Sequence, residues 1–182
     1  MSDWTWATDS RYPSFCLVLF RDVAVSDLLE VYGISTGATQ LLHLDEVPYA
    51  FPLDTPGSLV RCGTSGRWSF FFESSGSQGA DKRMIERVKT EEALQIIKGG
   101  DGTNAIAHFT HGRQTEHFEP GRPAEVYGDG PHTLSAQLVQ AASEKGSLWL
   151  DECLDIIGTH LGFSIPRHLL DGPLVTFFVP AQ

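Results

Sequence analysis

The residues from Ser14 to Arg21 read SFCLVLFR, with six hydrophobic side chains in succession. A strand that is buried on both faces has this pattern, because its side chains alternate between two covered sides of a sheet. A membrane-spanning helix would need about 20 apolar residues, and no stretch of the chain approaches that length. We therefore expect a central strand in a folded domain that does not enter a membrane.

Two pairs of short strand-like runs, each pair separated by a glycine-containing loop, indicate two β-hairpins. The first pair covers residues 59–62 and 68–73, and the second covers residues 104–110 and 115–119. The run LVTFFV at residues 174–179 predicts a closing strand. Because hairpins join neighbouring strands in opposite directions, we expect an antiparallel or mixed sheet made from the two hairpins and the first and last strands.

Helical spacing of apolar residues and glycine stop signals predict helices at residues 27–32, 80–98, 131–145 and 148–162. These helices fall in separate blocks rather than after every strand. That order favours an α+β fold over a doubly wound sheet. Because the chain has no internal repeat and no linker, we expect a single domain over residues 1–182, with its helices packed on one face of the sheet.

Two segments carry aromatic side chains outside these helices and strands: an N-terminal arm at residues 1–13 and a long loop at residues 34–57. Prolines at four-residue spacing preclude regular structure in this loop, and a loop of about 20 residues is a candidate binding lid. The aromatic side chains either cover the sheet or form a recognition surface. As candidate partner contacts we name Trp4, Trp6, Tyr12, Tyr49 and Phe51.

Five short segments together resemble an uncharacterised family. They are DWTWA at residues 3–7, FCLVLFRDV at 15–23, WSFFFE at 68–73, TNAIAHF at 103–109 and FEP at 118–120. In this order they are similar to a domain-of-unknown-function family of high-GC filamentous bacteria, and the closing helix pair before LGFSIP is also similar. The resemblance implies a bacterial, cytoplasmic protein, and it implies no particular reaction.

The chain has three cysteines, Cys16, Cys62 and Cys153, which are far apart and form no CxxC pair. An odd number of widely separated cysteines favours reduced, buried thiols in a cytoplasmic protein over disulfides. A structural zinc site usually needs four Cys or His ligands, often in closely spaced pairs. We therefore expect no bound metal and no cofactor.

Acidic residues outnumber basic residues by 23 to 13, which gives a formal net charge of −10. Such a charge repels DNA and RNA, so we expect no nucleic-acid partner. It favours a basic protein partner through electrostatic steering. Because the sequence contains no specific catalytic motif, the first hypothesis is a non-enzymatic intracellular accessory, regulatory or immunity-type protein that binds a protein partner.

The second hypothesis is a small enzyme or small-molecule-binding protein that uses the second hairpin. If Gly112 and Arg113 form the turn, His108 faces His117 directly on the partner strand, with Glu119 further along. Two imidazoles and a carboxylate on one sheet face could line a pocket for proton transfer or ligand binding. A pocket that contains His108, His117 and Glu119 would favour this hypothesis over the first.

Overall fold

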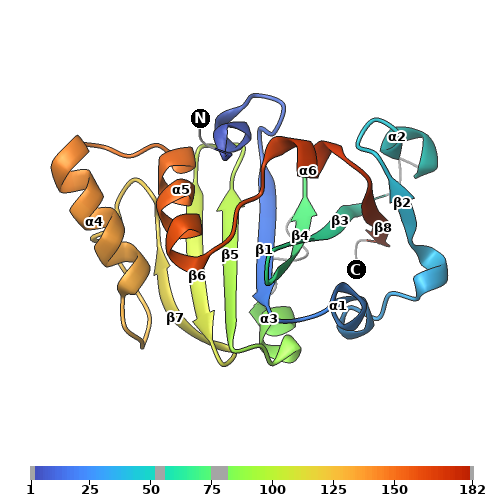
Figure 1. Ribbon diagram of the computed structural model, residues 1–182, viewed down its shortest axis with the longest axis horizontal. Coiled ribbons are helices and arrows are strands. Elements are labelled where there is room, and N and C mark those ends of the chain that lie inside the picture. Colours follow the sequence, from blue (N-terminus) through green and yellow to red (C-terminus); the bar gives the residue numbers. More distant parts are fainter. Residues whose placement is uncertain (1–2, 52–55, 75–81, 181–182) are drawn as a thin grey trace.

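The computed structural model describes residues 3–51, 56–74 and 82–180. Parts of three expected segments lie outside the described residues: residues 1–2 of the arm, 52–55 of the loop and 80–81 of the second helix. The described residues form one α+β domain, in which helices pack against an open, eight-stranded antiparallel sheet (Figure 1). No helix of this described part is long and apolar enough to cross a membrane.

All strands of the sheet run antiparallel to their neighbours. Their spatial order is β2-β8-β3-β4-β1-β5-β6-β7, so β1 lies in the interior between β4 and β5. Residues 15–20 of β1 are all buried, which confirms the central strand. In chain order the strands are β1 (Phe15–Arg21), β2 (Gln40–Leu42), β3 (Gly57–Ser65), β4 (Trp68–Glu73), β5 (Glu92–Lys98), β6 (Asn104–Thr110), β7 (Arg113–Phe118) and β8 (Leu174–Pro180).

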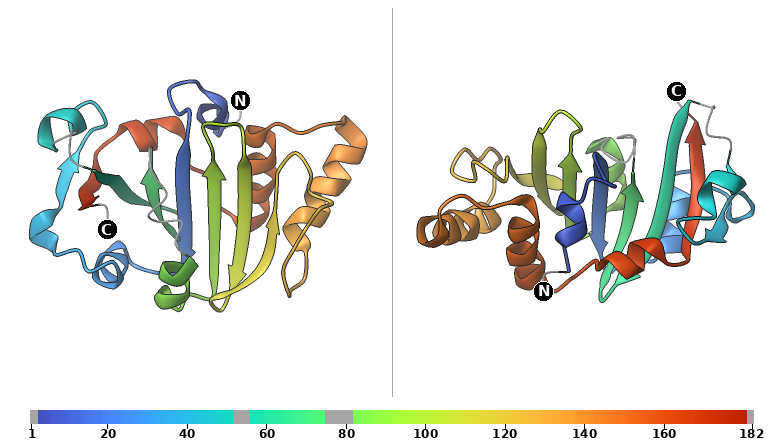
Figure 2. Two further views of the ribbon diagram at one scale, coloured as in Figure 1. Left: turned by 180° about the vertical axis from the view of Figure 1, so that it is seen from behind. Right: turned by 90° about the horizontal axis from the view of Figure 1, so that it is seen from above.

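The helices pack on both faces of the sheet, so the expectation of a single covered face is wrong. Figure 2 shows α4, α5 and α6 on one side, which we call the front face, and α1 and α3 on the opposite, back face. In chain order the helices are η1 (Thr5–Thr8), α1 (Val25–Val31), η2 (Thr36–Ala38), α2 (Val47–Ala50), α3 (Lys82–Val88), α4 (Thr133–Lys145), α5 (Leu150–Leu161) and α6 (Arg167–Asp171).

Each face of the sheet has its own hydrophobic core, because the central strands bury side chains in both directions. Leu17 and Leu19 of β1 belong to the front core together with Phe70 of β4. Val18 and Phe71, which alternate with them, belong to the back core. Full burial of a side chain of this size contributes about 1.5–3 kcal/mol relative to exposure. Both faces therefore need a cover of helices or loops.

One expected helix is in fact a short helix followed by a strand. The segment at residues 80–98 contains α3 and then β5, and the helix ends before Lys89, whose positive φ of 52° cannot continue it. β5 pairs with β1 on one side and with β6 on the other. The sequence EALQIIK misled because its apolar pairs, 93–94 and 96–97, fit a helix as well as a strand buried on both faces.

The expected loop at residues 34–57 contains regular structure in its described part, namely η2, β2 and α2. β2 pairs with β8 and forms one edge of the sheet. Pro48 lies in the first turn of α2, where a helix does not need the N–H group that proline lacks. The expectation of a wholly irregular loop is therefore wrong, because prolines at this spacing still permit short elements between them.

Candidate functional site

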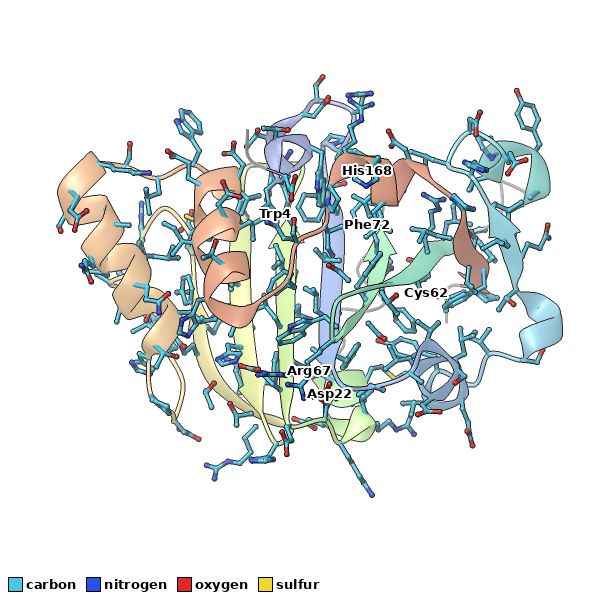
Figure 3. All side chains as sticks on the ribbon, in the orientation of Figure 1. Trp4, Asp22, Cys62, Arg67, Phe72 and His168 are labelled. Atoms are coloured by element: carbon cyan, nitrogen blue, oxygen red, sulfur yellow. The ribbon has the colours of Figure 1, made fainter. Side chains whose placement is uncertain are left out.

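The three aromatic side chains of the N-terminal arm are buried on the front face. Trp4 packs against α5 (Figure 3), where a Cβ atom at Gly158 would lie 3.3 Å from Trp4 Nε1. The indole N–H of Trp6 donates a hydrogen bond to the backbone carbonyl of Ile165 at 2.6 Å. Tyr12 is also buried. Trp4, Trp6 and Tyr12 thus cover the sheet, which is the first of the two alternatives for these aromatic side chains, and as buried residues they do not form a recognition surface.

The two aromatic residues near α2 lie in a different environment. Tyr49 on α2 is 92% exposed, and Phe51, directly after α2, is partly buried. Leu41 on the edge strand β2 is exposed as well. This end of the sheet therefore presents aromatic and aliphatic surface, and partner contact at Tyr49 and Phe51 stays a prediction.

The second hairpin turns one residue earlier than expected. The turn consists of His111 and Gly112, whose φ angles of 51° and 74° have the positive sign that a two-residue type I′ turn requires. Thr110 consequently pairs with Arg113. The expected turn at Gly112 and Arg113 is wrong, because the glycine takes the second central position of the turn and not the first. A register shift by one residue moves the side chains of a strand to the other face of the sheet.

This shift and a bulge next to His108 separate the residues of the expected pocket. His108 pairs with Glu116, whereas His117 pairs with Ala107. His108 is buried on the front face, while His117 points to the back face and is exposed. Glu119 lies beyond the end of β7 and is also exposed. The structure therefore does not bring His108, His117 and Glu119 into one pocket.

His108 belongs instead to a row of alternating charges on the front face, which the sequence analysis missed. One residue from each of β1, β5, β6 and β7 forms this charged row: Arg21, Glu92, His108 and Glu116. Arg21 Nη1 lies 2.7 Å from Glu92 Oε2. His108 bridges two carboxylates, with Nε2 3.0 Å from Glu92 and Nδ1 3.6 Å from Glu116. The exposed fraction falls from 34% for the Arg21 side chain to 0% for that of Glu116.

Glu116 connects the charged row to the N-terminus of α4. Its carboxylate accepts hydrogen bonds from the backbone N–H groups of Leu134 at 3.0 Å and Ser135 at 2.9 Å, which have no partner inside the helix. The Thr133 hydroxyl donates a further bond at 3.3 Å. Burial raises the pKa of this carboxyl, but His108 and the two N–H groups lower the pKa more, to about 2. A charged side chain from a strand thus caps the helix.

His108 is held in its charged form. Burial lowers its pKa, but the neighbouring carboxylates of Glu116 and Glu92 raise the pKa more, to about 9. At neutral pH an imidazolium has no free lone pair, so His108 can neither accept a proton nor bind a metal ion while the charged row is intact. The geometry therefore favours a structural role for the charged row, which holds the first turn of α4 against the sheet through the hydrogen bonds of Glu116.

The three cysteine thiols are free and buried. Burial raises the pKa of Cys62 and of Cys153 to about 12, and burial also raises the pKa of Cys16. Because the thiolate is the reactive form, these thiols are poor nucleophiles at neutral pH. Within residues 3–51, 56–74 and 82–180, no group of three or more His, Cys, Asp or Glu side chains is arranged to hold a metal ion.

A groove between α4 and α5 is a second feature that the sequence analysis missed. It is lined by Gln137 of α4 and by Asp155, Ile156, Thr159 and His160 of α5, and its volume is about 430 Å³. The Gln137 side-chain amide donates a hydrogen bond to His160 Nδ1 at 2.8 Å. Asp155 contributes a carboxylate to this groove. Sequence patterns showed which sides of the two helices are apolar, but not how their outer sides meet.

Comparison with known proteins gives a family but no activity. Residues 1–145 match a family of unknown function, DUF6461. The match ends at the last residue of α4, so α5, α6 and β8 lie outside it. No curated protein and no solved structure matches the chain. The comparisons supply no reaction, ligand or partner, and a function has to be argued from the geometry.

Proposed function

Because the chain belongs to the DUF6461 family, whose function is unknown, we propose a function on structural grounds. The protein is a non-enzymatic intracellular factor, of an accessory, regulatory or immunity type, that binds a basic segment of a protein partner. The observation that supports this most directly is an excess of acid on α4 and α5. Residues 133–161 contain four carboxylates and a single lysine: Glu144, Asp151, Glu152, Asp155 and Lys145.

Most of these carboxylates form no ion pair with the cationic side chains that the structure describes. Among the residues that the structure describes, no ion pair within 4 Å includes Glu144, Asp151 or Asp155. Some other surface carboxylates are paired, as Asp22 is with Arg67 (Figure 3). Others in the described part of the chain are in no ion pair either: Asp27, Glu30 and Asp45. A surface with uncompensated carboxylates attracts basic partners and accelerates their association.

The reactive groups of the fold also support recognition over catalysis. A general base works best when its pKa lies near the operating pH. His108 has a pKa of about 9 and is engaged by Glu92 and Glu116. The alternative of a small enzyme or small-molecule binder at the second hairpin needs His117 beside His108, and these two side chains point to opposite faces.

A peptide-display selection on the immobilised full chain tests this function. An unrelated protein of similar negative charge serves as the control for unspecific attraction. We expect the selected peptides to carry net positive charge and to bind more weakly as salt rises, because the Debye length shrinks to about 8 Å at physiological ionic strength. Selection of neutral or acidic peptides alone, or equal retention by the control protein, would contradict the proposed function.

A further inference from the structure

We propose that one extended, basic segment of a partner protein docks along α5. A lysine or arginine side chain of this segment enters the groove between α4 and α5 and pairs with Asp155, and a second cationic side chain stacks on the ring of Trp149. This inference rests on the proposed function, and it adds to that function a defined surface with residues that can be substituted one at a time.

The residues that would contact the segment form one stripe along α5. Trp149 is the N-cap residue of the helix, and Glu152, Ile156 and Thr159 follow at intervals of three, four and three residues. This spacing places them on the same side of the helix. Ile156 and Thr159 also line the groove. A segment that leaves the groove toward the start of α5 therefore meets Glu152 and then Trp149.

The groove suits a long cationic side chain. Ile156 provides an apolar wall for methylene groups, and Asp155 provides a carboxylate for the charged head. Gln137 and His160 are hydrogen-bonded to each other, which leaves Asp155 as the charged acceptor. The groove is an open surface depression of about 430 Å³ and not an enclosed cavity, so it can hold a side chain that lies along the surface.

Trp149 differs from the other tryptophans of the chain in its exposure. Its side chain is 73% exposed, whereas the other three are each 1% exposed: Trp4, Trp6 and Trp68. An exposed indole face attracts ammonium and guanidinium groups, which bind within about 6 Å of the ring centre. Glu144 and Asp151 flank Trp149 in the sequence and add negative charge at this end of α5. The ring and the carboxylates thus favour the same kind of partner.

Charge selects a basic segment over two other occupants of such a surface. A second copy of the chain also carries a formal charge of −10, so the two copies repel each other. A nucleic acid is repelled for the same reason. A basic protein segment has the complementary charge. Self-association and nucleic-acid binding are therefore outcomes that the experiment has to detect.

Two substitutions in this surface and two matched substitutions elsewhere test the inference. Asp155→Asn removes the groove carboxylate, and Trp149→Ala removes the exposed ring. Asp45→Asn and Leu41→Ala make comparable changes at exposed residues on or just after β2. Figure 1 shows α2 and β2 at the opposite end of the molecule from α4. The probe is a fluorescein-labelled peptide of alternating arginine and serine, followed by fluorescence anisotropy at low and at physiological salt.

We expect Asp155→Asn and Trp149→Ala each to raise the Kd by about three- to tenfold, and the two matched variants to change the Kd by less than about twofold. Circular dichroism checks that all variants fold. If the wild-type chain binds and the groove variants bind equally well, the proposed function stands and this surface is overturned. If the wild-type chain does not bind, both fail. A dimer that Trp149→Ala dissociates, or binding of duplex DNA along α5, would also overturn the inference.

Discussion

Glu116 Oε2 lies 2.9 Å from the backbone nitrogen of Ser135, so a buried carboxylate of β7 caps the N-terminus of α4. The same carboxylate lies 3.6 Å from His108 on the neighbouring strand β6. This double contact fixes the first turn of α4 against the sheet. Because α4 contributes Gln137 to the groove, the charged row also supports the geometry of the proposed docking surface.

Glu116→Gln should lower the free energy of unfolding by about 2–4 kcal/mol, because it leaves His108 as a buried charge without this partner and weakens the helix cap. Urea unfolding followed by circular dichroism measures the change. Glu119→Gln, an exposed glutamate just beyond the same strand, should change stability by less than about 0.5 kcal/mol. If Glu116→Gln lowers the free energy of unfolding no more than Glu119→Gln does, the Glu116 cap does not stabilise the fold.

Stability should be highest between pH 4.5 and pH 6.5. The pKa of His108 is raised from 6.5 to about 9 on folding, so its contribution is complete below pH 6.5 and is lost as pH rises through about 9. The pKa of Glu116 is lowered from 4.5 to about 2, so its contribution is complete above pH 4.5 and is lost as pH falls through about 2. Urea unfolding across this range measures both slopes.

His108→Gln should remove the alkaline slope, while His117→Gln should leave it in place, since His117 is exposed on the back face. The slope between pH 6.5 and 9 isolates His108, because the buried thiols begin to destabilise the fold only as pH passes their ordinary pKa of 9. If stability still falls between pH 6.5 and 9 in His108→Gln, groups other than His108 cause the loss.

Trp6→Ala should cost about 3–5 kcal/mol of stability, because it empties a buried aromatic site and removes the hydrogen bond to Ile165. Trp149→Ala should change stability by less than about 0.5 kcal/mol. Acrylamide should quench the fluorescence of the exposed Trp149 readily, and it should leave most of the emission from the three buried tryptophans. If Trp6→Ala proves as mild as Trp149→Ala, the N-terminal arm does not cover the sheet as described.

Duplex DNA should bind negligibly at physiological salt. The formal charge of −10 and the uncompensated carboxylates of α4 and α5 repel phosphates, and nucleic-acid binding requires a cationic surface. An anisotropy titration with a labelled oligonucleotide duplex measures this directly. Micromolar or tighter binding would show that the charge of the whole chain does not decide its choice of partner.

Local sequence patterns predicted the parts of the fold that depend on neighbouring residues. Six hydrophobic residues in succession, rich in aromatic and β-branched side chains, identified β1 as a strand buried on both faces. The same argument failed for β5, because EALQIIK has apolar residues at positions that a helix and a doubly buried strand share. Pairing with β1 and β6 decided that case, and such pairing depends on residues far away in the sequence.

The candidate site was harder to predict than the fold. A turn placed one residue too late put His108 beside His117, although the structure sends them to opposite faces. The charged row joins strands whose spatial order cannot be read from the sequence. No local pattern therefore indicated that Arg21 and Glu92 would form an ion pair. The groove depends on how α4 packs against α5, and a helical pattern shows only which side of each helix is apolar.

An NMR titration of the ¹⁵N-labelled chain with the arginine–serine peptide tests the central claim most directly, because it reports on every amide at once. We predict that the largest shifts fall on the backbone amides of residues 152–160, on the Gln137 side-chain amide and on the Trp149 indole N–H. Amides near Tyr49 should shift little. Shifts that centre on Tyr49, or that spread evenly over the acidic surface, would contradict a docking surface between α4 and α5.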